Sequence, residues 1–210
     1  MTVQLVGYEV LEKLHEGIST IIYRGTLLTN GQPVIIKILK PEQATPDNLA
    51  HFRREFTILM GLNSPQVISA YTLEPYQGSL AMTLEDIGGY ALDRSLMHGS
   101  IDVAQCLLIA TELAKAIGEI HQQRVIHKDI NPSHIIWNSN TKQLRLIDFG
   151  LADNLSQQHI LIQHPAALPG TLTYISPEQT GRVNRAVDYR TDFYSLGITL
   201  YPDVYREITV

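Results

Sequence analysis

Two aspartates, Asp129 and Asp148, have the residue type and the setting that phosphoryl transfer needs. Each lies in a short polar cluster after an apolar run, and the clusters read HKD and DFG. Between them, the apolar triplet 135–137, the polar turn 138–142 and the apolar run 144–147 predict a hairpin that brings both carboxylates to one edge of a cleft. One carboxylate would orient the proton of an attacking hydroxyl, and the other would hold the Mg²⁺ that bridges nucleotide phosphates. Two unrelated aspartates in surface turns are the weaker interpretation, because both clusters occur in order.

A lysine and a glutamate upstream form the second candidate pair. Lys37 is the single charged residue of the apolar strand predicted over 33–39. A buried lysine is costly without a carboxylate partner. The stretch 46–62 predicts a helix, because apolar residues recur there at helical spacing, at Leu49, Phe52, Phe56 and Leu59. Glu55 lies beside this stripe, so we expect it to pair with Lys37. The alternative is a lysine on the solvent face of an edge strand.

The remaining pattern is β-rich in the first third and helical afterwards. Residues 8–38 predict strands broken by turns, with a strong hairpin signal at Asn30-Gly31. Two further strands are predicted over 67–71 and 79–84. Residues 101–122 predict a long helix with little polar face in its middle, which we expect to be buried.

Taken in order, these motifs resemble the protein kinase family, whose catalytic loop is H-R-D-x-x-x-x-N and whose metal loop is D-F-G. Residues 170–178 resemble the end of a kinase activation segment, and 188–197 resemble the start of the large central helix. The residues of these motifs most resemble those of the N-terminal kinase domain of bacterial, notably cyanobacterial, multi-sensor hybrid signalling kinases. The resemblance covers about residues 8–201.

The resemblance implies an α+β, bilobal fold and a role for each site residue. The N-lobe would span about 1–87 and be β-rich, and a partial, helical C-lobe would span about 88–201. Asp129 would be catalytic, and Asp148 would bind the metal together with His134. Nucleotide binding would involve Gly17, Ile22, Lys37, Glu55, Glu85 and Ile87. The implied cofactors are ATP and Mg²⁺, with Mn²⁺ as the alternative metal, and Asp192 would brace the backbone of the catalytic loop.

Three residues of the catalytic loop depart from the family pattern. Lys128 replaces the usual Arg and lacks its bidentate fork. Asn131 replaces the Lys of serine/threonine kinases, so a charge that would stabilise the γ-phosphate is missing. His134 replaces the metal-binding Asn, although Mg²⁺ prefers oxygen ligands.

The nucleotide-binding half departs from the family at two places. Of the three glycines of the family's glycine-rich loop only the middle one, Gly17, is kept, so a plain hairpin is almost as well supported by these residues alone. Ile35 stands where the family usually has the Ala that packs on adenine.

Pro202 is expected to end the central helix at about Tyr201. By the family pattern the last helices of the C-lobe are then absent, and residues 202–210 form an aberrant tail. A truncated, frameshifted or fragmentary gene product is the simplest cause. We expect the exposed apolar face to make the chain poorly soluble or dependent on a partner.

Composition narrows the classes of function. The chain has 210 residues, with 44% hydrophobic and 18% charged residues, which suits a packed core. Its net charge of −5 argues against nucleic-acid binding. One cysteine, Cys106, excludes an internal disulfide and fits a reducing cytoplasm. No signal peptide and no membrane span are expected.

Three functions remain open from the sequence. The first is ATP-dependent transfer of phosphate to protein Ser/Thr by a truncated kinase domain in bacterial signalling. The second is a pseudokinase or docking module that binds nucleotide or a partner without efficient transfer, which Asn131 and His134 favour. The third is a small-molecule kinase of the aminoglycoside or choline type. The partners implied are ATP and a protein substrate or partner signalling domain.

Overall fold

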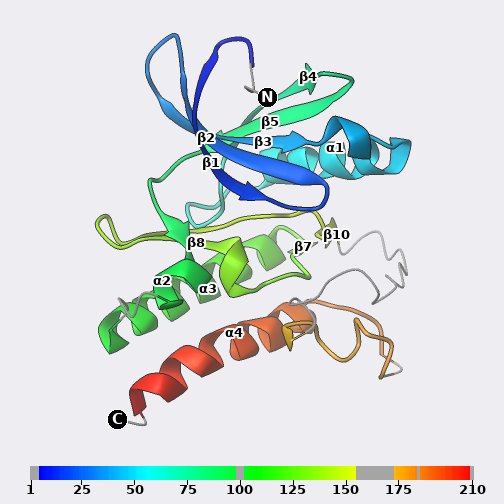
Figure 1. Cartoon of the computed structure of the whole chain (residues 1–210). Helices are drawn as coiled ribbons and strands as arrows, with labels where there is room; N and C mark the ends of the chain where they lie inside the picture. The colour runs from blue at the N-terminus through cyan, green and yellow to red at the C-terminus, as the bar shows by residue number, and fades with distance from the viewer. Residues whose placement is uncertain (1–4, 98–101, 155–172, 184, 209–210) are drawn as a thin grey trace. The chain divides into compact units, whose positions relative to one another are not determined.

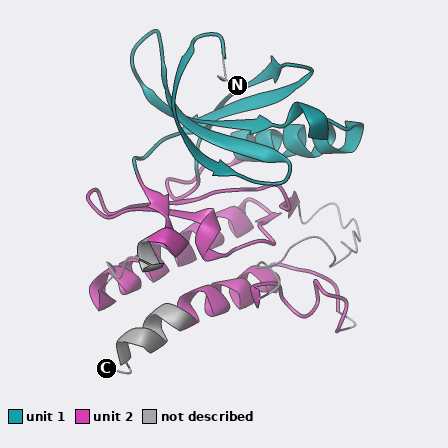
Figure 2. Ribbon diagram, in the orientation of Figure 1, with its two compact units in different colours: residues 1–61, 68–88 teal, residues 62–67, 89–210 magenta. Residues whose placement is uncertain are grey.

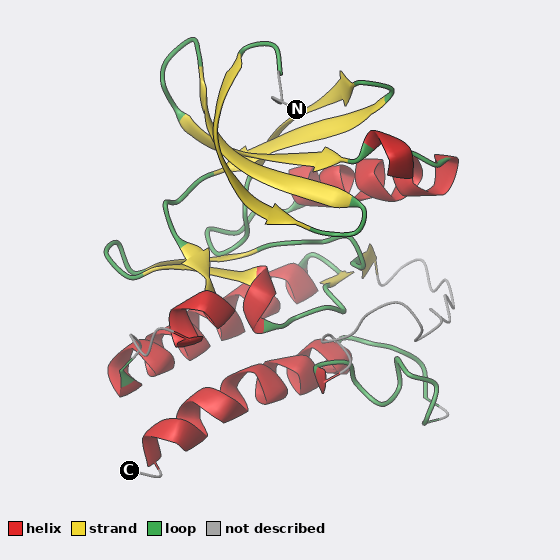
Figure 3. Ribbon diagram, in the orientation of Figure 1, coloured by secondary structure: helices red, strands yellow, loops and turns green. Residues whose placement is uncertain are grey.

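The chain forms two compact units, which are described separately. The computed structural model describes residues 5–97, 102–154, 173–183 and 185–208. The first unit comprises residues 1–61 and 68–88, and the second comprises 62–67 and 89–210 (Figure 2). Strands dominate the first unit, and helices dominate the second (Figure 3). The predicted α+β class is confirmed.

A five-stranded antiparallel sheet with one long helix makes up the first unit (Figure 1). The sheet order is β1-β2-β3-β5-β4. Its elements are β1 (Tyr8–Glu16), β2 (Thr20–Leu27), β3 (Pro33–Leu39), α1 (Pro46–Gly61), β4 (Ala70–Tyr76) and β5 (Ser79–Glu85), with a short 3₁₀ turn η1 (Pro41–Gln43) before α1. The predicted Asn30-Gly31 turn joins β2 to β3, where Gly31 adopts a φ of 70° and the Asn30 side chain accepts from the Gln32 amide.

Alternation along β3 separates an apolar core face from a second face that carries the charged residue of the strand. Val34, Ile36 and Ile38 belong to a buried cluster that includes Leu5, Tyr76 and Ala81. Successive strand residues point to opposite faces, so Ile35 and Lys37 lie on the other face. Register places Ile22 beside Lys37, and Lys37 beside Met82. Ile22 and Lys37, two of the residues predicted to contact a nucleotide, therefore share one face of this sheet.

The strand predicted over 67–71 begins later than expected. β4 starts at Ala70 and runs to Tyr76, whereas Val67 belongs to the second unit, where it bridges Leu146. The apolar pair Val67-Ile68 is buried without being part of a strand. Pro75 lies within β4, which is an edge strand, where a missing N–H is tolerated.

The helix α1 begins where the sequence indicates. Pro46 stands at its first position, where a missing N–H costs nothing. Thr45 precedes it as the cap, since its hydroxyl accepts from the Asn48 amide at 3.2 Å and its carbonyl from the Leu49 amide at 2.9 Å. Glu55 is among the buried residues of this helix.

The described part of the second unit has three α-helices and two small sheets. The sheet orders are β6-β8-β9 and β10-β7. Its elements are β6 (Tyr90–Ala91), α2 (Leu92–Met97), α3 (Val103–Gln122), β7 (Val125–Ile126), the 3₁₀ turn η2 (Pro132–His134), β8 (Ile135–Asn138), β9 (Gln143–Leu146), β10 (Asp153–Asn154) and α4 (Arg190–Ile208). The predicted hairpin between the two aspartates is β8–β9.

The long helix α3 buries one face rather than its whole circumference. Asp102 caps it by accepting from the Gln105 amide. The buried stripe has helical spacing, at Ile109, Leu113, Ala116, Ile117 and Ile120. Leu107 is 62% exposed, so the expectation that the middle of the helix is buried all round is wrong.

The expectation that Pro202 ends the central helix is also wrong. α4 runs from Arg190 to Ile208 and passes through Pro202. A proline removes one i→i−4 hydrogen bond, and this loss does not end the helix here. The expected kinase-like start of this helix is present at Arg190.

Part of the predicted activation segment lies outside the described residues. The described part, residues 173–178, is hydrogen-bonded to α4. Ser195 donates to the Tyr174 carbonyl at 2.7 Å, and Thr191 donates to the Glu178 carboxylate at 2.9 Å. Among the described helices, none combines the length and apolar character needed to cross a membrane.

Candidate functional site

The ion pair predicted between Lys37 and Glu55 is present in the first unit. The Lys37 ammonium lies 2.6 Å from one Glu55 oxygen and 2.9 Å from the other. Both side chains are buried, with 7% and 5% exposed. Lys37 comes from the face of β3 opposite the buried cluster, and Glu55 from the buried face of α1. The pair therefore fixes an ammonium group on the face that also carries Ile22.

The turn between β1 and β2 carries the predicted phosphate-loop glycine. The Gly17 amide donates to the Thr20 carbonyl at 2.9 Å. A Cβ added at Gly17 would meet its nearest atom, in His15, at 3.5 Å, which is ordinary contact. The hairpin itself therefore does not require a glycine at this position, and its small size leaves the backbone approachable.

The segment after β5 holds Glu85 and Ile87. The Glu85 amide donates to the Ser69 carbonyl at 2.9 Å, which ties the end of β5 to the residues before β4. Leu84, which precedes Glu85 in β5, is 7% exposed and lies beside Ile35 in the sheet. The predicted base-contacting residues are thus all present in the first unit.

A buried carboxylate in the second unit holds the loop that carries Asp129. Asp192 accepts from the His127 amide at 2.9 Å and from the Lys128 amide at 2.8 Å. Its side chain is 0% exposed and also lies 2.7 Å from Nε2 of His121. Lys128 adopts a φ of 68°, a left-handed conformation that a non-glycine residue rarely takes without support. Asp192 supplies that support, as predicted.

His127 is a structural residue and not a base. Its Nε2–H donates to the Ile147 carbonyl at 3.0 Å, and Nδ1 accepts from the Asp129 amide at 3.3 Å. This pairing needs a neutral ring. Burial lowers the pKa of His127, which keeps the ring neutral. The ring also packs edge-on against Phe149, and so couples the two predicted loops.

Asn131 organises the residues after Asp129. Its Oδ1 accepts from the Ser133 amide, which fixes the orientation of the amide group. Its Nδ2 then donates to the Asp129 carboxylate at 3.1 Å. Burial raises the pKa of Asp129, and the neighbouring His134, His127 and Asn131 oppose this rise. Sequence reasoning treated Asn131 as a missing charge and did not find this contact.

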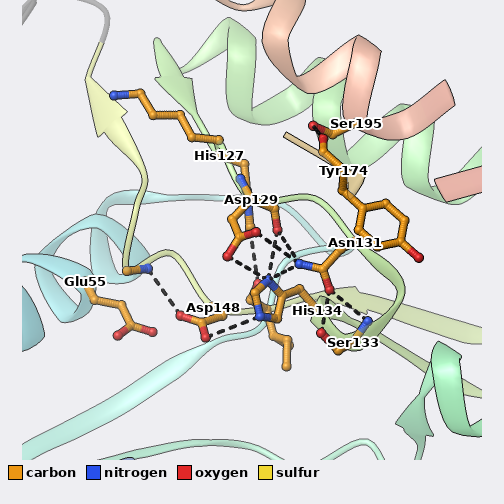
Figure 4. A network of polar contacts seen from close by, with 12 residues as sticks. Glu55, His127, Asp129, Asn131, Ser133, His134, Asp148, Tyr174 and Ser195 are labelled. Carbon is orange, nitrogen blue, oxygen red and sulfur yellow. Dashed lines mark hydrogen bonds and ion pairs between the residues drawn. The ribbon is translucent and has the colours of Figure 1, made fainter. Parts of the chain in front are cut away.

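His134 lies between the two predicted aspartates (Figure 4). Its Nδ1 is 3.4 Å from Asp129 Oδ2, and its Nε2 is 3.6 Å from Asp148 Oδ2. Nδ1 also lies 2.8 Å from the backbone carbonyl of Asp129, to which it can donate, and 3.0 Å from Nδ2 of Asn131, from which it can accept, so the tautomer decides which bond forms. In the tautomer with the proton on Nδ1, the Nε2 lone pair is directed toward the Asp148 carboxylate. A lone pair facing a carboxylate is favourable when a cation lies between them.

Lys128 has a partner that the sequence did not indicate. Its ammonium lies 3.1 Å from Asp153 Oδ2, and the Asp153 side chain is 8% exposed. The backbone carbonyl of Lys128 accepts from Nε2 of Gln179 at 2.8 Å. Asp153 follows the DFG cluster in β10, which pairs with β7. Lys128 therefore connects the loop of Asp129 to the chain that follows Asp148.

The structure brings Asp129, His134 and Asp148 together in the second unit, and Gly17, Ile22, Lys37, Glu55, Glu85 and Ile87 all lie in the first. Within the described residues, no group of three or more His, Cys, Asp or Glu side chains is arranged to hold a metal by itself. A metal at Asp148 and His134 would thus need oxygen ligands from a bound nucleotide or water.

Breaking the Lys37–Glu55 pair should destabilise the chain unless both charges are removed. Glu55→Leu leaves a buried ammonium without this carboxylate, so we expect the free energy of unfolding to fall by about 3–5 kcal/mol. Lys37→Met combined with Glu55→Leu removes both charges and should recover most of that loss. Urea denaturation of the 210-residue chain measures both. A loss below about 1 kcal/mol for Glu55→Leu, as for an exposed pair, would contradict burial of the pair.

Replacing Asp129 should stabilise the chain at neutral pH. Because burial raises its pKa, the folded chain binds this proton more tightly than the unfolded chain. Stability is therefore lost as the pH rises from the unfolded value near 3.8 through the raised folded pKa. Asp129→Asn should raise the Tm at pH 7, and the gain should disappear at a pH below about 3.8.

Asp188 provides a control of opposite sign for this pH series. Its hydrogen bond with Arg190 lowers the pKa of its carboxyl. Its contribution to stability is present above the unfolded pKa and is lost in acid. Asp188→Asn should therefore lower the Tm at pH 7. If Asp129→Asn also lowered the Tm at pH 7, the Asp129 carboxylate would be stabilising and our account of it wrong.

Comparisons with known proteins agree with this geometry. A family model described as protein kinase domain matches residues 8–209. A probable serine/threonine-protein kinase of Clostridium perfringens is 29% identical over 196 residues, which cover 92% of this chain and 28% of that protein. The serine/threonine-protein kinase PknB of Mycolicibacterium smegmatis is 31% identical over 201 residues, covering 92% of this chain and 32% of PknB.

A third relative, the serine/threonine-protein kinase pkn2 of Myxococcus xanthus, is 28% identical over 198 residues and is covered to 24%. The chain thus spans about a quarter to a third of the length of these relatives. Since the family model matches almost all of its residues, the chain belongs to the protein kinase family.

Proposed function

We propose that this chain transfers the γ-phosphate of ATP to serine or threonine hydroxyls of a protein in bacterial signalling. The observation that carries the proposal is the position of His134 between two aspartates: its Nδ1 lies 3.4 Å from Asp129 Oδ2, and its Nε2 lies 3.6 Å from Asp148 Oδ2. The relatives bear the name serine/threonine-protein kinase, and this supports a protein substrate.

Asp129 would receive the proton of the attacking hydroxyl. Its raised pKa makes the carboxylate a better proton acceptor than an exposed aspartate. The hydrogen bond from Asn131 leaves its second oxygen to accept from a substrate hydroxyl. Asn131 lacks a charge for the γ-phosphate, so its part here is to orient the carboxylate.

The donor set around His134 fits a divalent cation. Histidine ligands in metal sites usually donate their other N–H to a carboxylate, a backbone carbonyl or water, and Nδ1 of His134 is placed to donate to the carbonyl of Asp129 at 2.8 Å. Nε2 and the Asp148 carboxylate would then be the ligands. When bound, the metal neutralises charge on the phosphates. One nitrogen ligand favours Mn²⁺ over Mg²⁺, which prefers oxygen.

The first unit would contribute the contacts to the nucleotide. The Lys37 ammonium, fixed by Glu55, suits the α and β phosphates. The backbone near Gly17 is open to close approach, because a side chain is not needed to pack there. Ile22 and Ile35 offer apolar surface on the same face for a purine base.

A pseudokinase or docking module is the second candidate. Two observations favour it: Asn131 provides no positive charge, and the second metal ligand of the family is replaced by His134. This candidate predicts nucleotide binding without turnover, and so it is separable from the first by experiment.

A radiolabel transfer assay with ATP and a generic protein substrate tests the proposal. We expect label on serine and threonine, and a loss of at least about 100-fold in kcat for Asp129→Asn with little change in the Kd for ATP. Binding of ATP without any transfer would favour the pseudokinase. Transfer to choline or an aminoglycoside in place of protein would favour a small-molecule kinase.

The metal preference should follow His134. Because Nε2 is a nitrogen ligand, we expect greater activity, or tighter ATP binding, with Mn²⁺ than with Mg²⁺. His134→Asn should raise the Mg²⁺-dependent value and narrow the difference between the two metals. His51→Asn, at an exposed position in α1, is the matched control and should change neither. Equal activity in both metals, unaltered in His134→Asn, would remove the nitrogen ligand from the proposal.

A further inference from the structure

An ion pair joins β2 to the segment that follows β5. Nε of Arg24 lies 2.6 Å from Asp86 Oδ2, and its Nη2 lies 3.5 Å from Asp86 Oδ1. The Asp86 side chain is 5% exposed and that of Arg24 is 19% exposed. A nearly buried, two-point pair of this kind has a fixed geometry, unlike an exposed ion pair.

The same carboxylate fixes the backbone beyond it. Asp86 Oδ1 accepts from the Gly88 amide at 2.7 Å. Gly88 adopts a φ of 70°, which a glycine takes without strain. The peptide groups from Asp86 to Gly88 are thereby held by a side chain that is itself held from β2.

Arg24 lies on the part of the sheet that carries the proposed base contacts. It is two residues from Ile22, so the two side chains share one face of β2. Register places Arg24 beside Ile35, and Ile35 beside Leu84. One pair therefore links the strand that carries Ile22 to the backbone of Glu85 and Ile87.

We propose that Arg24 and Asp86 are a positioning pair that sets the affinity of this chain for the purine ring of its nucleotide. Hydrogen bonds from backbone groups to a base need those groups in one orientation before binding. The pair provides this fixed orientation because it holds residues 85–88 against the strand that carries Ile22. This inference rests on the proposed function and identifies what tunes its nucleotide site.

Two probes separate the base from the phosphates: ATP, and inorganic tripolyphosphate, which has no base. Titration calorimetry on the full chain gives both affinities. Asp86→Ala removes the pair and the acceptor for the Gly88 amide, and should weaken ATP binding about tenfold, the effect of losing one hydrogen bond. Tripolyphosphate affinity should stay unchanged, and kcat at saturating ATP should also stay unchanged.

Graded variants show which contact matters. Asp86→Asn keeps an oxygen for the Gly88 amide and removes the charge, so its loss should be smaller than that of Asp86→Ala. Arg24→Gln should weaken ATP binding about as much as Asp86→Asn does. Arg24→Lys keeps the positive charge, so it should weaken ATP binding less than Arg24→Gln. Arg190→Gln breaks an exposed pair with Asp188 in the second unit, and is the control that should leave both affinities unchanged.

The outcomes distinguish this inference from the proposed function. If the wild-type chain binds ATP and all Arg24 and Asp86 variants bind it equally well, the inference alone is wrong. If Asp86→Asn, with an unchanged Tm, weakens ATP and tripolyphosphate to the same extent, the pair is not specific to the base and the inference is again wrong. If the wild-type chain binds neither probe, the proposed function and the inference both fail.

Discussion

The carboxylate of Asp192 is the contact on which the candidate catalytic residues depend. It is fully buried and accepts two backbone amides from the loop of Asp129. The two hydrogen bonds that Asp192 accepts stabilise the left-handed backbone of Lys128, whose φ is 68°. Without them, Asp129 could not present its carboxylate beside Asn131. A helix start far along the sequence thus fixes the loop where the chemistry is proposed.

Charge pairs position functional groups and backbone segments in both units. In the first unit, Lys37–Glu55 and Arg24–Asp86 hold an ammonium group and a backbone segment on one face of the sheet. In the second, Lys128–Asp153 connects the chain after Asp148 to the loop of Asp129. Each pair is largely buried, so removing one partner is costly and the geometry is tightly specified. Such pairs suit a site whose groups must be positioned before a ligand binds.

Sequence reasoning predicted the contacts that leave a local signal. A lone charge in an apolar strand and a carboxylate beside an apolar stripe indicated Lys37 and Glu55. It did not predict Arg24–Asp86, whose members are 62 residues apart in the chain and leave no periodic pattern. From the sequence, Asn131 was interpreted only as the loss of a positive charge. Its hydrogen bond to Asp129 was not predicted, because the orientation of its amide group depends on the fold. Pro202 was read as a helix end, because a local rule cannot weigh the turns that flank it.

We propose a site in which a divalent cation, bound with nucleotide, has one nitrogen ligand from the protein, Nε2 of His134. Pulsed electron paramagnetic resonance of Mn²⁺ with ATP, on chain labelled with ¹⁵N-histidine, measures this directly, because the label separates imidazole from adenine nitrogen. A ¹⁵N coupling to Mn²⁺ is expected in the wild type and in His51→Asn, and its loss in His134→Asn. A wild-type spectrum without any ¹⁵N coupling, under conditions where Mn²⁺–ATP is bound, would contradict it.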